Sequence, residues 1–198
     1  HIQSGFADGV PLRGMDLSDD DRGMLRQYQF LSDRPIVTVL NIHEQDVATT
    51  QTLTERYQLS GASDQSMTVA LSASLEMELQ GLSETDGEEY RQSVGVGESA
   101  LNAVIRLSYA GLGLISFFTV GSDECRAWTV KDGDNAQRAA RCIHTDLERG
   151  FIRAEVVLCE DLVATGSEAE ARKQALLHTE GKDYLVQDGD VLHILFSV

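Results

Sequence analysis

The chain has 198 residues, 42% of them hydrophobic, and 32 acidic against 16 basic side chains give it a formal net charge of −16. This length and apolar content suffice for one or two domains with their own cores. No apolar run approaches the ~20 residues of a membrane-spanning helix. The acid excess repels phosphate backbones, so we expect no DNA binding, and any RNA contact to be local.

The three cysteines, Cys125, Cys142 and Cys159, form no C-x-x-C pair and lie in apolar local contexts. This pattern favours buried, reduced thiols over a disulfide or a metal site. Residues 1–10 are polar and mixed, which is not the pattern of a secretory signal. We therefore expect a cytoplasmic protein without a bound metal.

The first 34 residues are predicted to hold one short helix between irregular segments. His1–Arg13 has no periodicity and contains two glycines and a proline, which favours a loop. Ser18 is a favourable N-cap for a helix that has three aspartates, Asp19–Asp21, in its first turn.

Two apolar runs, Pro35–Leu40 and Met67–Leu71, are predicted to be strands. Each is followed by a polar loop and then a helical segment, which is the pattern of a parallel sheet covered on both faces. We expect helices at about 47–57, 75–79, 84–91 and 98–112, a loop at 61–65, and an end to the last helix at Gly111 and Gly113.

Ligands of open parallel sheets bind beyond the carboxyl ends of the strands. The two loops to examine are therefore Asn41-Ile42-His43-Glu44 and Ser72-Ala73-Ser74. The residues alone leave two interpretations open, because Asn41 could cap a turn and Glu44 could lie in solvent. His43 is interpreted as an exposed loop residue.

The last part of the chain, residues 113–198, is predicted to be a small mixed sheet. Two hairpins with helices packed on one face form a β-grasp fold, in which turn residues separate short β-branched and aromatic runs. The predicted elements are a hairpin of Ile115–Thr119 and Cys125–Val130, a helix capped by Asn135, a strand Phe151–Leu158, a helix capped by Ser167, and a hairpin of Tyr184–Gln187 and Val191–Val198.

Three long runs in this part carry a family resemblance. They are FFT-G-xx-E-x-RAWT from Phe117 to Thr129, IHTDLERGFIRAEVV from Ile143 to Val157, and GKDY-VQDGDVLH from Gly181 to His193. Residues 113–198 resemble the C-terminal TGS domain of the Obg-like ATPases, the YchF subfamily of translation-associated P-loop NTPases. The resemblance implies that residues 35–112 are the C-terminal part of an α/β NTPase domain, and that residues 1–34 are the end of its helical insertion and a linker.

The same resemblance gives the two loops a meaning. It implies that Asn41, Ile42 and Glu44 occupy the N-x-x-E base-recognition motif, and that Ser72 and Ala73 form the base-supporting loop. An Asp in the last position can accept two hydrogen bonds from guanine, whereas the longer Glu misplaces that fork. The family's preference for ATP over GTP follows from this difference.

No phosphate-binding motif is present in these 198 residues. A P-loop requires G-x-x-x-x-G-K-[ST], but the one Gly-Lys pair, Gly181-Lys182, is followed by Asp183 and has Leu176 at the first glycine position. We expect ATP or GTP with Mg²⁺ to be a cofactor of a longer parent protein, and this chain alone to bind nucleotide weakly and not hydrolyse it. A C-terminal portion of an ATPase and a paralogue that has lost the site both fit this pattern.

The binding hypothesis for the last part is RNA contact. Its basic residues could form one local face near Trp128 and Phe151, suited to ribosomal RNA, or could be solvated arginines with ion-pair partners; they are Arg126, Lys131, Arg138, Arg141, Arg149 and Arg153. The resemblance implies ribosome association. His144, Asp146 and Glu148 are interpreted as a charged turn and not as a metal site. Two functions remain: part of a ribosome-associated ATPase, or a nucleotide-independent module that binds RNA or protein.

Overall fold

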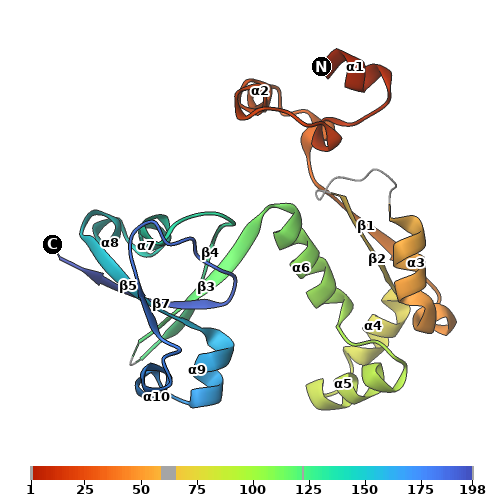
Figure 1. Cartoon of the computed structure of the whole chain (residues 1–198). Helices are drawn as coiled ribbons and strands as arrows, with labels where there is room; N and C mark the ends of the chain where they lie inside the picture. The colour runs from red at the N-terminus through yellow and green to blue at the C-terminus, as the bar shows by residue number, and fades with distance from the viewer. Residues whose placement is uncertain (1, 59–65, 122, 198) are drawn as a thin grey trace. The chain divides into compact units, whose positions relative to one another are not determined.

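The computed structural model describes residues 2–58, 66–121 and 123–197. The chain divides into two compact units, His1–Leu112 and Gly113–Val198 (Figure 1). The predicted loop at 61–65 lies outside the described residues. The α/β class predicted from the sequence is confirmed, with a parallel sheet in the first unit and a mixed sheet in the second.

The first unit begins with short helices around a small apolar cluster. The prediction of a loop over the first thirteen residues is wrong, because Leu12, Met15 and Leu17 are buried and draw the segment into helical turns. The guanidinium of Arg13 donates to the carbonyl of Ser32, 3.2 Å away, and so ties the first turns to the segment before the sheet. The elements are α1 (Ile2–Ala7), η1 (Leu12–Gly14), α2 (Asp19–Leu25), η2 (Arg26–Tyr28) and η3 (Leu31–Asp33).

Ser18 caps α2 as predicted, since its side chain accepts a hydrogen bond from the backbone N–H of Asp21. The same type of cap starts three later helices of this unit, at Ser72, Ser83 and Ser99. Each satisfies an N–H that the first helical turn leaves without a partner.

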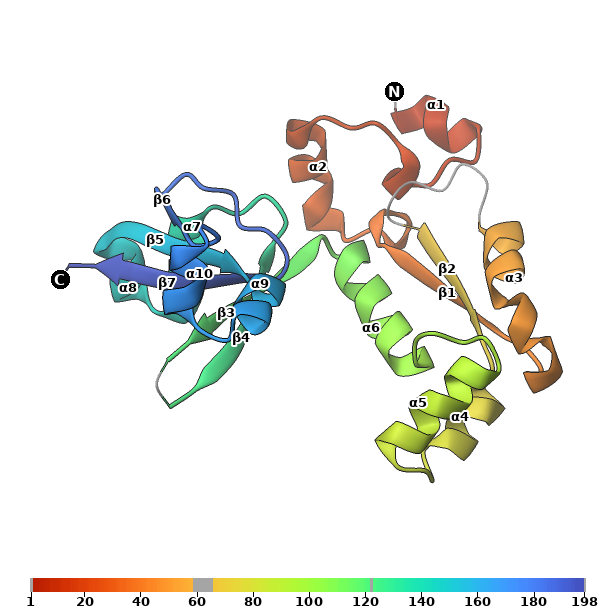
Figure 2. The same cartoon turned by 60° about the horizontal axis from the view of Figure 1, so that its bottom comes forward.

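Two parallel strands form the sheet of the first unit, β1 (Ile36–Asn41) and β2 (Ser66–Leu71). Their register pairs Ile36 with Ser66 and Asn41 with Leu71, so the two strands end together. Helices α3 (Thr50–Tyr57) and α6 (Ala100–Gly111) lie on opposite sides of them (Figure 2). The remaining elements are η4 (Glu44–Thr49), α4 (Ala73–Leu79) and α5 (Glu84–Ser93).

The predicted burial of both strands is only partly correct. Alternate residues of β2 are buried, but β1 is half-buried to exposed along its length, and Val39 is 45% exposed. The physical reason is that β1 has a neighbouring strand on one side only within the described residues.

The second unit is a five-stranded mixed sheet of strand order β4-β3-β7-β5-β6. Strand β7 lies at its centre, parallel to β3 and antiparallel to β5, which is the β-grasp arrangement. The strands are β3 (Leu114–Val120), β4 (Cys125–Lys131), β5 (Phe151–Leu158), β6 (His178–Glu180) and β7 (Asp190–Phe196). The helices are α7 (Ala136–Ile143), α8 (Thr145–Arg149), α9 (Cys159–Thr165) and α10 (Glu168–Lys173).

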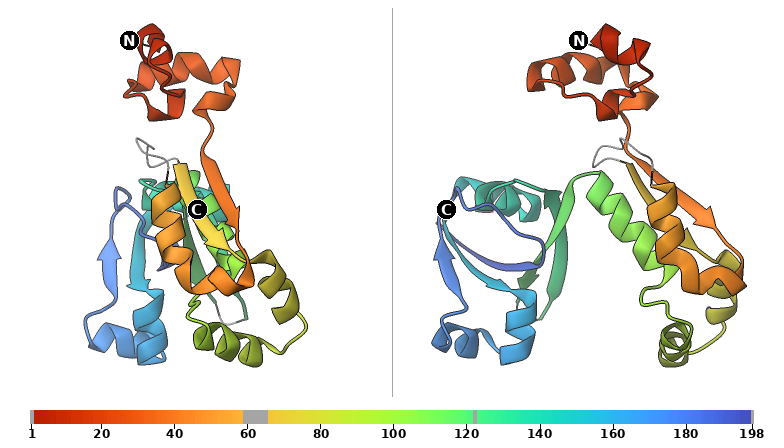
Figure 3. Two further views of the ribbon diagram at one scale, coloured as in Figure 1. Left: turned by 90° about the vertical axis from the view of Figure 1, so that its right-hand side faces the viewer. Right: turned by 45° about the vertical axis from the view of Figure 1, so that its right-hand side comes forward.

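Two predictions for this unit are wrong. Residues 184–187 form no strand, and the partner of β5 at the sheet edge is instead β6. The helices do not share one face of the sheet either, because adjacent residues of β5 enter different clusters: Val156 packs with Phe117 and α7, and Val157 packs with Ala171 of α10. Since side chains alternate along a strand, α7 and α10 lie on opposite faces (Figure 3).

A buried carboxylate holds the loop before β7. Asp190 is 1% exposed and accepts hydrogen bonds from the hydroxyl of Tyr184 at 2.9 Å and the backbone N–H of Gln187 at 2.8 Å. Burial, and then Asp190, raise the pKa of Tyr184 well above its usual range. The tyrosine therefore stays protonated and remains a donor to the carboxylate.

Candidate functional site

The two loops singled out in the sequence lie side by side at the carboxyl ends of β1 and β2. The side-chain Oδ1 of Asn41 accepts a hydrogen bond from the backbone N–H of Ala73 at 3.1 Å. Ser72 is buried, and its hydroxyl accepts from the N–H of Leu75, which starts α4 directly at this edge. The contact joins residues that are 32 positions apart in the sequence.

This bond decides which atoms of the first loop remain available. With its Oδ1 occupied, exposed Asn41 can present its amide N–H groups to a ligand. The backbone N–H of Ile42 already donates to the carbonyl of Leu71 at 2.9 Å, so the carbonyl is the backbone group that Ile42 can still offer.

Glu44 lies apart from this contact. It is exposed at the first position of η4, and His43 caps that turn, with its Nδ1 accepting from the N–H of Gln45 at 3.2 Å. His43 is itself exposed, in agreement with its interpretation as a loop residue. The structure thus brings Asn41, Ser72 and Ala73 together and leaves the carboxylate of Glu44 in solvent.

The basic residues of the second unit do not share one face. Arg138 and Arg141 project from α7, where they are 71% and 68% exposed and pair with Asp134 at 2.9 Å and with Glu148 at 3.7 Å. Arg153 precedes Ala154, which packs toward α7, so by strand alternation it lies on the opposite face. The six residues therefore do not gather on one face, and Arg138 and Arg141 fit the second alternative, exposed arginines with ion-pair partners.

The other basic positions lie in β4 and at the end of α8. The guanidinium of Arg126 lies 4.5 Å from the ring centroid of Trp128, in the geometry of a cation–π contact. The indole N–H of Trp128 donates to the hydroxyl of Thr119 at 2.9 Å. Lys131 ends β4 and Arg149 ends α8, and both are exposed.

The charged turn at residues 144–149 is structural. The Nδ1 of His144 accepts from the N–H of Asp146 and starts α8. Within the described part of the chain, no group of three or more His, Cys, Asp or Glu side chains could hold a metal ion. The prediction that all three cysteines are buried is wrong, because Cys125 and Cys142 are exposed.

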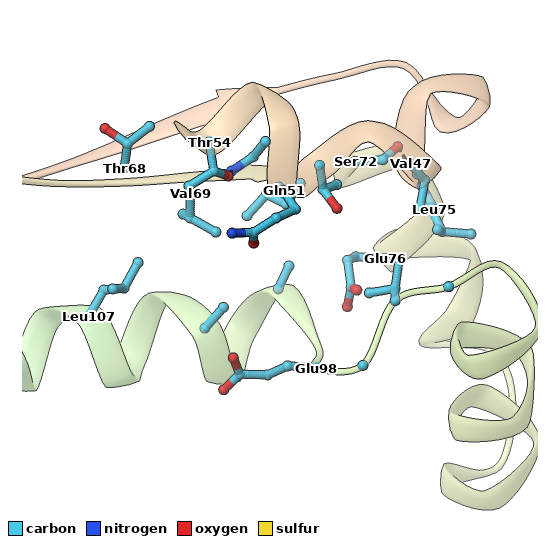
Figure 4. A pocket seen from close by; sticks show the side chains of 18 of the residues that line it. Val47, Gln51, Thr54, Thr68, Val69, Ser72, Leu75, Glu76, Glu98 and Leu107 are labelled. Atoms are coloured by element: carbon cyan, nitrogen blue, oxygen red, sulfur yellow. Dashed lines mark hydrogen bonds between the residues drawn. The ribbon is translucent and has the colours of Figure 1, made fainter. Parts of the chain in front are cut away.

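The sequence analysis did not predict the cavity beside β2. A slot of about 350 Å³ runs between α3 and α6 along β2, and Figure 4 shows Gln51, Glu76 and Glu98 around it. Its walls come from residues 47–54, 68–76 and 95–107, which no local pattern connects. No helix in residues 2–58, 66–121 and 123–197 has the length and apolarity to cross a membrane.

Comparisons with known proteins agree on one family. Residues 114–197 match the family model YchF-GTPase_C, described as "Protein of unknown function (DUF933)". The "Ribosome-binding ATPase YchF" of Bacillus subtilis is 36% identical over all of this chain and 54% of its own length. The protein of the same name from Haemophilus influenzae is 38% identical over 94% of this chain and 51% of its own length.

A solved structure extends the match to three dimensions. The YchF GTPase of Schizosaccharomyces pombe aligns with 98% of this chain and 52% of its own, with a TM-score of 0.80 and 27% identity. The chain spans about half the length of the curated relatives it matches. Over its whole length the chain is similar to the C-terminal portion of the YchF proteins, and residues 114–197 match the family model of their C-terminal domain.

Proposed function

We propose that this chain is the C-terminal portion of a ribosome-associated ATP/GTP-binding protein of the cytoplasm. In this proposal the first unit contributes the base-recognition loops, and the second is a TGS domain that contacts the ribosome. The observation that carries it is the hydrogen bond between Asn41 and Ala73, which joins the two loops at the carboxyl edge of a parallel sheet, where such sheets bind their ligands.

The two edges of the β1–β2 sheet differ in a way that supports its being part of a larger sheet. At the outer edge of β2, the hydroxyl of Thr54 accepts from the N–H of Ala70, and the amide of Gln58 donates to the carbonyl of Ser66. These side chains close that edge against a further strand. Among the described residues, no comparable contact covers the outer edge of β1.

Helix α6 carries more apolar surface than the two strands can cover. Leu101, Ile105 and Leu112 form an exposed stripe, 68%, 48% and 59% accessible, whereas Ala103 on the inner face is buried. Spacings of four and seven residues place these side chains along one side of a helix. Further strands beside β1 would lie beneath such a stripe, as in a doubly wound sheet.

The described residues fit one part of a nucleotide. The amide of Asn41 can donate to a ring nitrogen of a purine, and the Ser72–Ala73 turn can support the base. ATP or GTP would bring Mg²⁺ with its phosphates, but these 198 residues contain no P-loop to hold either. The chain's own contribution to the proposed activity is therefore recognition of the base.

An activity measurement tests whether this chain supplies base recognition while a P-loop outside these residues supplies phosphate binding. We expect the chain alone to show no ATP turnover, because the phosphate cradle is missing. A chimera with the complementary N-terminal half of the Bacillus subtilis relative should bind and hydrolyse ATP. In that chimera, Asn41→Ala should weaken ATP binding about tenfold, the effect of losing about 1.4 kcal/mol.

The matched control is Asn102→Ala, which removes an exposed amide from α6, away from the loops. It should leave the ATP affinity unchanged. Steady ATP turnover by the chain alone, or equal affinity of the Asn41→Ala and parent chimeras, would contradict the proposal.

Ribosome contact is assigned to the second unit on the basis of the exposed arginines of α7. Reversing both charges, with Arg138→Glu and Arg141→Glu, should abolish co-sedimentation with ribosomes at low salt, because phosphate contacts depend on positive charge. The matched control is Arg172→Glu with Lys173→Glu on α10, which are similarly exposed at 57% and 74%.

Co-sedimentation also separates the two candidate functions. If the chain without nucleotide pellets with ribosomes as strongly as the ATP-bound chimera, the second unit acts as a nucleotide-independent binding module. Unchanged pelleting of the Arg138/Arg141 variant would reject this surface as the contact.

A further inference from the structure

The slot between α3 and α6 lies along the outer edge of β2, apart from the contact between Asn41 and Ala73. Apolar side chains make up much of its wall, and two alanines of α6, Ala100 and Ala103, face it from one side. Gln51 and Thr54 of α3 face it from the other side (Figure 4). Its volume of about 350 Å³ is that of a small-molecule site.

Backbone polarity along β2 gives the slot a hydrogen-bonding edge. The carbonyl of Leu71 accepts from Ile42, so Leu71 directs its backbone groups toward β1. Alternate residues of a strand direct theirs to opposite sides, so Ser66, Thr68 and Ala70 point theirs outward. The contacts of Gln58 and Thr54 with Ser66 and Ala70 confirm this direction.

Thr68 is the outward residue that these contacts leave open. It is 6% exposed, and neither its N–H nor its carbonyl has a hydrogen-bond partner within the described part of the chain. A buried backbone group without a partner costs about 1–3 kcal/mol, which favours a ligand or ordered water at this position. The two groups present an adjacent donor and acceptor to the slot.

The charges around the slot are already neutralised. Glu98 pairs with Arg106 at 2.9 Å, and Glu76 pairs with Arg91 at 3.2 Å. A charged ligand would therefore find no unpaired counter-charge among these groups. Alanine-lined walls and a donor–acceptor edge instead suit a flat, uncharged molecule.

We propose that this slot binds a small uncharged heterocycle of the nucleobase type, whose adjacent ring nitrogen and amino group pair with the N–H and carbonyl of Thr68. Another strand is a poorer occupant, because Thr54 already holds the N–H of Ala70. Of the five residues proposed for base recognition, Ser72 also lines this slot, whereas Asn41, Ile42, Glu44 and Ala73 do not.

The test is a titration of the ¹⁵N-labelled chain with 9-methyladenine, which carries the ring nitrogen and amino group but no sugar or phosphate. The amide resonance of Thr68 is expected to shift. 9-Methylpurine, which lacks the amino donor, should bind about tenfold more weakly. Ala100→Leu fills the slot from α6 and should raise the Kd for 9-methyladenine at least tenfold.

Two controls keep the result specific. Ala110→Leu adds the same bulk at an exposed position of α6 outside the slot and should leave the Kd unchanged. Asn41→Ala should also leave it unchanged, which separates this site from the proposed base loops. If Ala100→Leu fails to fold, Gln51→Phe fills the slot from the opposite wall and is expected to give the same loss.

Either of two outcomes overturns the proposal. One is the absence of any shift at Thr68. The other is a set of shifts confined to the edge at Asn41 and Ala73, lost in Asn41→Ala but insensitive to both filling variants.

Discussion

Replacing Asp190 with alanine is expected to destabilise the second unit by roughly 3 to 5 kcal/mol, because two donors lose a buried, charged acceptor worth about 1.5–3 kcal/mol to each. Those donors are the hydroxyl of Tyr184 and the backbone N–H of Gln187. Urea unfolding followed by the fluorescence of Trp128, the single tryptophan of the chain, measures the loss.

Two further variants separate the hydrogen bonds from general effects of charge removal. Asp183→Ala removes an exposed carboxylate that takes no part in these two hydrogen bonds, and should change stability by less than about 0.5 kcal/mol. Asp190→Asn keeps the shape and one acceptor, so its stability should fall between those of the parent and Asp190→Ala. Equal stability of Asp190→Ala and Asp183→Ala would contradict the assigned role.

Gly150→Ala is expected to cost about 3 kcal/mol, at the upper end of the range for overpacking. A Cβ at Gly150 would overlap the backbone carbonyl of Ser197, and would also approach the carbonyl of Asp146. The close approach is needed because the N–H of Ser197 donates to the carbonyl of Gly150 at 2.9 Å.

The comparison for this prediction is Gly181→Ala, since a Cβ at Gly181 meets no atom within 4 Å. We expect thermal unfolding to show a clear drop in Tm for Gly150→Ala and little change for Gly181→Ala. Similar Tm values for the two variants would contradict this prediction, because they would mean that the backbone after β7 can move to accept the Cβ without loss of stability.

The elements that can be predicted from the sequence are those fixed by residues that are close together in the chain. Strand β5 has the predicted bounds, and Asn135 caps α7 as expected, with its side chain accepting from the N–H of Arg138. The parallel pairing of β1 and β2 is also predictable, because strand–helix–strand order fixes it. That pairing is why the two site loops could be expected at one edge.

The failed predictions concern long-range partners. Residues 184–187 resemble a strand, but the carbonyl of Tyr184 accepts from the N–H of Ala136, and the N–H of Val186 donates to the carbonyl of Asp134. These two bonds form an isolated antiparallel β-bridge between Asn135 and Leu185, just before α7, in place of the predicted strand. No local pattern reveals such partners about 50 positions away.

Prediction of the candidate site was also limited by contacts between residues distant in the sequence. The meeting of the two loops was predictable, but the bond from Ala73 to Asn41 depends on one side-chain rotamer. The slot beside β2 was not predictable, because it exists only where three separate segments pack around a strand edge.

The central position of β7 has a consequence for biogenesis. The strand that joins β3 to β5 is the last of the five to be synthesised. On a translating ribosome the β3–β4 hairpin can form early, but β3 and β5 stay unconnected until residues 190–196 emerge. Folding of this unit must therefore be late and dominated by distant contacts, which slows it, and a nascent chain exposes apolar strand faces in the interval.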